Sequence, residues 1–388
     1  MATLRFPTRA LMAAILTFML VGTNPASTND TIRIIVGGVE KQIYLPVKLA
    51  EQLGYFRSEG LNVEILSEPD GGSAQDQLLA GAAEAVVGFY DHAIDLQAKG
   101  AFVESVVQLS RAPGEVVIVA SRKAHAMRSP ADWKGSTLGV TGLGSSTNFL
   151  IDSIAAKNGV KVREVTVLPV GSGNTFLAAL RDGRIDGGIT ADPTASRVVK
   201  TGLGKILIDL RRPEQMHKVF GGMYPAAAVY MKTGYVESHR DLTQRLVKAF
   251  VKALRYIDTH SAENIAEKVP SDYYAGDKAM YVEALAQGKA MFTNDGVMPK
   301  GGPETVYRVL AAFDTRLKGR AIDLPRTYTT AFVDVARNMG KRTSTTKPLP
   351  SLRSRNSTCA PCDSAISLTI ASPKPLPSVR PSRTPRTR

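Results

Sequence analysis

Cysteine is almost absent from this chain of 388 residues. The only two, Cys359 and Cys362, stand close together near the C-terminus, in a segment rich in Pro, Ser, Thr and Arg. The rest of the chain therefore cannot rely on disulfides, and its length is ample for a hydrophobic core that makes them unnecessary. A Cys-x-x-Cys pair can be redox-active or form half of a zinc site, but no second ligand pair accompanies this one. We expect it to have neither role.

Recognisable catalytic patterns are also missing. The five histidines show no metal-ligand spacing, and no Gly-x-Ser-x-Gly elbow is present. A glycine-rich run at residues 142–147 resembles no complete P-loop, because no lysine follows the glycines. These absences favour binding over catalysis, and we expect a protein that is not an enzyme and uses no cofactor and no metal.

The formal net charge of +14 is concentrated at the C-terminal end. Residues 341–388 contain ten Lys or Arg and one acidic residue, Asp363. A nucleic-acid-binding face needs basic residues clustered on a structured surface, and the sequence shows no such cluster in the remainder. Since residues 341–388 also lack aromatics, we expect a disordered basic tail and no nucleic-acid partner.

Long hydrophobic runs are rare, and the one at the N-terminus is short. Arg5 and Arg9 precede the apolar residues 10–21, which are too few for an ordinary transmembrane helix. This pattern predicts a signal peptide over residues 1–27 and a periplasmic protein from which that peptide is cleaved.

One supersecondary unit occurs twice, about a hundred residues apart. Each copy reads as strand, Gly-rich loop, helix, strand, Gly/Ser loop, helix and strand. The expected strands are 31–36, 62–66 and 85–89 in the first copy and 137–140, 165–169 and 187–191 in the second. Strands that alternate with helices of this length indicate parallel βαβ units, so we predict an α/β protein with two similar lobes.

The β-rich runs between and after the two units suggest that the chain crosses twice between the lobes. We expect the first part of lobe 1 at residues 31–118, lobe 2 at 119–225, and a return to lobe 1 with C-terminal helices at 226–340. The crossings would form a two-segment hinge.

Loops at the carboxyl ends of parallel strands lead into helix N-termini, where free N–H groups favour anionic or hydrogen-bond-accepting ligands. Such loops begin at Gly37, Asp70, Thr141 and Gly171. A cleft between lobes is also a usual place for a small ligand. The candidate ligand-binding residues lie in or near these loops: Gly38, Tyr44, Gly72, Ser73, Phe89, Tyr90, Asp91, Gly144, Ser145, Ser146, Thr147, Asp192 and Tyr224.

Each candidate also has a purely structural interpretation. Glycine supplies unusual backbone angles, and Ser, Thr or Asn caps helices whether or not a ligand binds. Asp91 and Asp192 either pair with a ligand amine or cap the next helix. Aromatic residues such as Tyr44 and Tyr224 either line the cleft or pack in the core.

Several segments resemble nitrate/sulfonate/taurine-type substrate-binding proteins of ABC transporters. Residues 45–64, with Gly54-Tyr55-Phe56 followed by Gly60-Leu61, resemble a typical segment of that family. Residues 71–81, 132–140, 144–147 and 179–186 are similar to further family segments. The resemblance spans residues 32–338, and the tail departs from it.

The resemblance implies a two-lobed periplasmic binding protein fold, type II-like, in which each lobe has a βαβαβ-based sheet with flanking helices. It also implies a receptor for a small-molecule ligand, either a nitrate-, sulfonate- or taurine-like anion or a small heterocycle. Its partners would be an ABC transporter permease and its ATPase, and we expect a monomer. Two alternatives remain open: an enzyme on the same fold that forms a pyrimidine precursor, although the Cys-rich motif of such an enzyme is absent, and a solute sensor for a membrane signalling protein.

Overall fold

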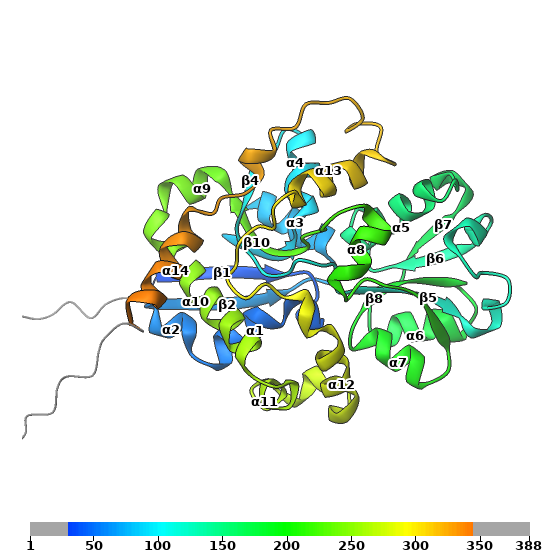
Figure 1. Ribbon diagram of the computed structural model, residues 1–388, viewed down its shortest axis with the longest axis horizontal. Helices are drawn as coiled ribbons and strands as arrows, with labels where there is room; N and C mark the ends of the chain where they lie inside the picture. Colours follow the sequence, from blue (N-terminus) through cyan, green and yellow to red (C-terminus); the bar gives the residue numbers. More distant parts are fainter. Residues whose placement is uncertain (1–29, 344–388) are drawn as a thin grey trace, which may run out of the picture. The chain divides into compact units, whose positions relative to one another are not determined.

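A computed structural model describes residues 30–343. The predicted signal peptide lies outside these residues, as does the predicted tail from residue 344 onward. The described part contains two five-stranded sheets with flanking helices (Figure 1). We call the first sheet and its helices lobe 1, and the second sheet and its helices lobe 2.

Lobe 1 is built on a sheet of order β2-β1-β3-β10-β4. Four of its strands run in the same direction, and β10 runs antiparallel to both of its neighbours. The strands are β1 (Asp30–Val36), β2 (Leu61–Ser67), β3 (Ala85–Phe89), β4 (Val103–Gln108) and β10 (Ala227–Lys232). β-branched and other apolar residues fill β1, β3 and β10 and are almost wholly buried, as expected for strands covered on both faces.

Lobe 2 repeats this arrangement with the order β7-β6-β8-β5-β9. Its strands are β5 (Glu115–Ala120), β6 (Thr137–Val140), β7 (Thr166–Pro169), β8 (Gly187–Ala191) and β9 (Gly204–Asp209). Here β5 is the antiparallel fourth strand. The two-lobed α/β periplasmic binding protein fold expected from the sequence is therefore confirmed.

The register makes individual positions of the two sheets comparable. In lobe 1 Ala227 pairs with Phe89, and in lobe 2 Glu115 pairs with Ala191. Each fourth strand then has a register shift against the fifth at the same depth, after Val229 and after Val117. Glu115 of lobe 2 thus occupies the position of Ala227 in lobe 1.

The chain passes between the sheets at two places, residues 109–114 and residues 210–226. The sequence placed the first division after residue 118, which is inside β5. The pairing of the whole of β5 with β8 and β9 corrects that boundary. Apolar strand residues before and after a crossing look alike in sequence, which explains the error.

Helices cover both sheets (Figure 1). In lobe 2, α5 (Ser146–Lys157) contacts β6 and β8, while α6 (Asn174–Arg181) and α7 (Thr194–Lys200) pack on the other side in a separate apolar cluster with Val116 and Ile118. The second crossing contains α8 (Pro213–Phe220). The helices of lobe 1 and of the C-terminal part are α1 (Leu45–Gln52), α2 (Tyr55–Ser58), α3 (Gly71–Ala80), α4 (Asp91–Ala98), α9 (Thr233–Ser238), α10 (Arg240–Thr259), α11 (Ala262–Ala266), α12 (Lys278–Gly288), α13 (Gly302–Ala311) and α14 (Ala331–Thr343).

The long helix α10 illustrates how these helices are held. Leu246, Val247, Phe250 and Leu254 form an apolar stripe at helical spacing, and all four are fully buried. Burying one such side chain contributes about 1.5–3 kcal/mol. α14 continues to Thr343, so the first three residues of the expected tail are helical. None of the helices within residues 30–343 is long and apolar enough to cross a membrane.

Candidate functional site

The carboxyl ends of the parallel strands in the two lobes meet, and the loops after them touch directly. Ser146 Oγ donates to Asp91 Oδ1 at 2.7 Å, and Ser172 Oγ donates to Glu40 Oε1 at 2.9 Å. The backbone N–H of Gln42 donates to the carbonyl oxygen of Asp192 at 2.9 Å. The candidate site is therefore an interlobe boundary in which loops from opposite sheets are already in contact.

Two glycines permit this close approach. A Cβ added at Gly142 would lie 2.4 Å from the carboxylate of Asp70, and one at Gly72 would lie 3.4 Å from the carbonyl oxygen of Leu143. Asp70 caps α3 by accepting hydrogen bonds from the N–H groups of Gly72 and Ser73. A side chain at residue 142 would therefore either displace the Asp70 carboxylate from its capping position or push the lobes apart.

Next to this contact is an open groove of about 510 Å³ between the ends of β1, β2, β6 and β7. Its rim includes Glu40, Glu68, Thr141 and Ser172. Asp70 and Ser145, which adjoin the rim residues, are buried. The groove therefore leads from solvent toward the buried polar residues of the boundary.

Lobe 1 contributes a buried cation to the boundary. Lys41, 4% exposed, donates from Nζ to the carbonyl oxygen of Gly37 at 2.6 Å. Burial lowers the pKa of Lys41, and the charges of Glu115, Glu40 and Asp70 oppose that shift. Gly38 leaves room for this side chain, because a Cβ there would lie 2.6 Å from Lys41 Cε.

Asp91 joins three segments of the molecule. It is fully buried at the start of α4 and accepts hydrogen bonds from Ser146 of lobe 2 and from the hydroxyl of Tyr224 at 2.9 Å. Burial raises the pKa of Asp91, whereas the neighbouring His92 and the two hydrogen bonds lower it. Ser146 Oγ also lies 3.3 Å from His92 Nε2.

Lobe 2 contributes two buried carboxylates at the ends of its strands, where β5 begins and just after β8 ends. Asp192 is satisfied: it accepts a hydrogen bond from Arg211 Nη1 at 2.9 Å and others from the backbone and hydroxyl of Ser196. Glu115 differs, because it is 3% exposed and its Oε2 has no hydrogen-bond partner among the described residues. Burial raises the pKa of Glu115 to about 7, opposed by Lys41 and reinforced by Asp192.

The hydroxyl-rich run at the start of α5 is mostly engaged within lobe 2. Ser145 caps the helix and donates to the carbonyl oxygen of Gly142 at 2.7 Å. Thr147 bonds to Thr141. Of the three predicted hydroxyls only Ser146 reaches lobe 1, and Gly144, with φ 73°, serves the turn before the helix.

The aromatic candidates are divided between two places. Tyr44 and Phe89 form an edge-to-face pair with ring centroids 6.3 Å apart, and Tyr44 faces the boundary, where the charge of Glu115 helps burial to raise the pKa of its hydroxyl. Tyr90 instead bonds to Thr327 and packs against Tyr328 within the C-terminal part. Ser73 Oγ donates to Asp70, so this hydroxyl also has a partner in its own lobe.

Several residues of the boundary were not among the sequence candidates, namely Lys41, Asp70, His92, Glu115 and Arg211. Asp70 and Lys41 lie in or beside loops that were singled out, so loop position pointed to their neighbourhood. Glu115 opens an apolar strand and resembles an exposed first residue. Alignment of the two internal copies, which sets it against Ala227, is the signal that would have revealed it. Among residues 30–343 no group of three His, Cys, Asp or Glu residues is placed to hold a metal ion.

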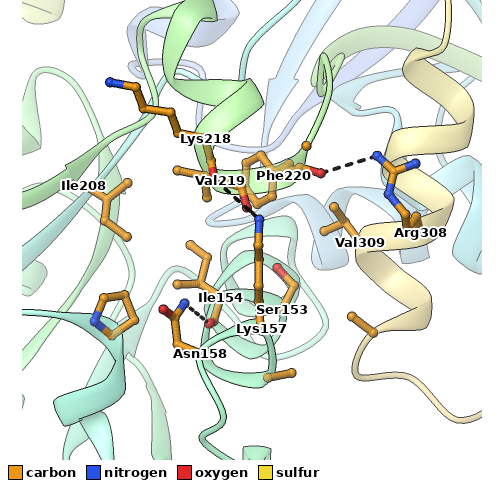
Figure 2. A pocket seen from close by; sticks show the side chains of 14 residues that line it. Ser153, Ile154, Lys157, Asn158, Ile208, Lys218, Val219, Phe220, Arg308 and Val309 are labelled. Atoms are coloured by element: carbon orange, nitrogen blue, oxygen red, sulfur yellow. Dashed lines mark hydrogen bonds between the residues drawn. The ribbon is translucent and has the colours of Figure 1, made fainter.

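A second hollow, of about 600 Å³, lies between α5, α8 and α13 (Figure 2). Lys157 reaches the carbonyl oxygens of Lys218 and Val219, and Arg308 reaches that of Phe220. These two cations thus satisfy the free carbonyls at the end of α8, and most of the other lining is apolar. The hollow is a less suitable place for a polar solute than the interlobe boundary.

Solved structures share this fold at low sequence identity. The periplasmic nitrate-binding protein NrtA of Synechocystis PCC 6803 has a TM-score of 0.64 at 12% identity, over 80% of this chain and 88% of that one. The desulfurization enzyme DszB has a TM-score of 0.53 at 15% identity, over 80% and 99%. Binding proteins and an enzyme therefore both occur on the fold.

Other comparisons are based on sequence as well. YtlA of Bacillus subtilis (strain 168), named as a binding protein, is 22% identical over 236 residues, which cover 59% of this chain and 67% of YtlA. A solved structure from Bordetella bronchiseptica RB50 is 34% identical with a TM-score of 0.77, over 80% of this chain and 98% of that one. The family described as NMT1/THI5-like matches residues 43–264. The chain belongs to the NMT1/THI5-like family.

Proposed function

We propose that the protein is an extracytoplasmic receptor that closes its two lobes over a small solute and delivers the solute to an ABC permease. The observation that supports this most is the set of buried polar side chains where the loops of the two lobes meet. Lys41, Asp91 and Glu115 are each at least 95% buried at a boundary that has to open before any solute can enter. Burying charged groups costs free energy, and the fold alone does not require them there.

Two polypeptide crossings give the lobes a route to separate. Lobes joined by only two segments of chain move mainly as rigid bodies about those segments. Separation would break the contacts Ser146–Asp91 and Ser172–Glu40 and expose Lys41 and Glu115 to solvent. A solute that supplies partners to these groups would then stabilise the closed form by binding to it in preference to the open one.

The test is to identify what the protein carries and what that compound does to the lobes. We expect denaturation of the freshly purified protein to release one small compound, which mass spectrometry identifies. Returning that compound to dialysed protein should lower the radius of gyration measured by small-angle X-ray scattering. Identical scattering profiles with and without saturating compound would contradict the receptor proposal.

The same sample tests catalysis. DszB shows that this fold also supports an enzyme, so the released compound should be incubated with the protein and followed by mass spectrometry. A receptor leaves it unchanged, whereas conversion to a product would favour the enzyme alternative.

A further inference from the structure

Glu115 is a buried charge that the architecture does not need. The equivalent position in the other sheet is Ala227, which is fully buried, pairs in the same register and begins the corresponding strand. The backbone carbonyl of each accepts the same hydrogen bond, from Leu210 in lobe 2 and from Leu109 in lobe 1. Because alanine completes this position in one lobe, the glutamate in the other calls for an explanation beyond folding.

The surroundings of Glu115 leave its charge incompletely matched. Lys41 supplies a nearby positive charge that opposes the rise in the pKa of Glu115, but among the described residues its ammonium makes no ion pair with Glu115 and donates to the carbonyl of Gly37 instead. Asp192 adds a second negative charge to the same sheet edge, and Arg211 is already shared between Asp192 and Asp209. Tyr44, with Asp70 and Asp91 beyond it, faces the same region from lobe 1.

We propose that Glu115 is the specificity residue of the interlobe site and that the solute presents to it a protonated nitrogen, as an organic cation or a zwitterion. This inference rests on the proposed receptor function and narrows its solute class. A carboxylate that is buried without partners is costly, and a ligand N–H group would remove that cost by donating to Oε2. A plain oxyanion at the same place would meet a like charge.

Matched probe pairs separate these solute classes. Taurine and ethanesulfonate differ by one ammonium group, and 4-aminopyridine carries a positive charge at pH 8 that pyridine lacks. Binding of each to dialysed full-length protein is measured by isothermal titration calorimetry at pH 8. We expect the charged-nitrogen member of at least one pair to bind at least tenfold more tightly than its partner.

Glu115→Gln assigns that preference to the residue, because it preserves shape and removes the charge. The substitution should weaken binding of the charged-nitrogen probe at least tenfold. Glu64→Gln, an exposed glutamate on β2, is the matched control and should bind like the wild type. Circular dichroism and melting curves of both variants establish that they are folded.

Lowering the pH provides an independent readout. Since burial raises the pKa of Glu115 to about 7 in the closed form without solute, acid neutralises it there, and affinity for the charged-nitrogen probe should fall roughly thirtyfold between pH 8 and pH 5.5. Other charged or titratable groups face the same region: Lys41, Tyr44, His92, Asp70, Asp91, Asp192 and Arg211. The affinity is therefore also measured at both pH values in Glu115→Gln, where the decrease should be no more than about threefold.

The outcomes distinguish this inference from the receptor proposal. Equal binding of the two members in both probe pairs, or binding of the charged-nitrogen probe by Glu115→Gln as tightly as by the wild type, would overturn the role of Glu115 and leave a receptor. Absence of binding by every probe, together with no released compound, would overturn both.

Discussion

The two lobes share a strand order and a register, yet they differ in the chemistry at the edge where they meet. In lobe 1 the fourth strand begins with Ala227, and charge comes from loops and helix starts, at Lys41, Asp70 and Asp91. In lobe 2 a carboxylate, Glu115, is built into the sheet itself. The repeated scaffold therefore shows which side chains the fold requires and which are additions to it.

The largest effect is expected when the buried carboxylate is introduced at the equivalent position of lobe 1. Ala227→Glu would bury a carboxylate in lobe 1 at the same strand position, with Asp91 in the same lobe and no additional cation. We expect it to lower the free energy of unfolding by about 3–5 kcal/mol, measured by urea denaturation. A change below about 1 kcal/mol would mean that lobe 1 tolerates the charge and that the lobes are not distinguished at this position.

A smaller effect is expected from pH. The pKa of Glu115 is raised in the folded protein, so its contribution to stability is full below the unfolded value and declines as pH rises through about 7. Between pH 5.5 and pH 8 this should cost the protein without solute about 2 kcal/mol. Urea denaturation at the two pH values measures it, and Glu115→Gln should remove that part of the slope.

Asp152 is the internal control for that experiment. It lies on α5, away from the lobe 2 sheet edge, and burial raises its pKa to about 7 as well. Asp152→Asn should therefore reduce the slope of stability against pH while leaving probe binding intact. Equal effects of the two variants on binding would show that Glu115 acts through stability alone.

The smallest predicted difference separates two neighbouring hydroxyls. Ser145→Ala removes a helix cap within lobe 2 and should cost about 1 kcal/mol of stability, read as a lower melting temperature. Ser146→Ala removes a hydrogen bond between the lobes and should instead open the protein, by about 1 kcal/mol, read as a larger radius of gyration. If both variants lowered the melting temperature and neither changed the radius of gyration, the predicted difference between Ser145 and Ser146 would be wrong.

Local sequence patterns were sufficient for most of the fold. Alternating β-branched runs and helical stripes, as in residues 31–36 and in α10, depend on nearby residues and on burial by their own lobe. The crossing at 109–114 was misplaced because Val116–Val119 would suit either sheet. Which sheet a strand joins depends on residues far away in the sequence, so the pattern within the strand does not reveal it.

The site was less accessible to sequence reasoning for the same physical reason. Ser145 and Ser146 look equivalent in the sequence, but one faces its own helix and the other faces Asp91 across the boundary. Lys41 and Glu115 are charged residues that a sequence alone would place in water, yet both are buried where the two lobes meet. The loops could be identified locally, whereas the partners of each side chain required the assembled pair of lobes.

The placement of β10 has a consequence for the order in which the two lobes can fold when the chain emerges N-terminus first. Lobe 2 draws all its strands from one unbroken stretch, residues 115–209, whereas β10 must insert between β3 and β4 from beyond that stretch. Until residues 227–232 arrive, β3 and β4 each present an unpaired edge, and such edges invite aggregation. The lobe whose synthesis starts first is thus the last to be completed, and it is the half of a nascent chain that most needs protection by a chaperone.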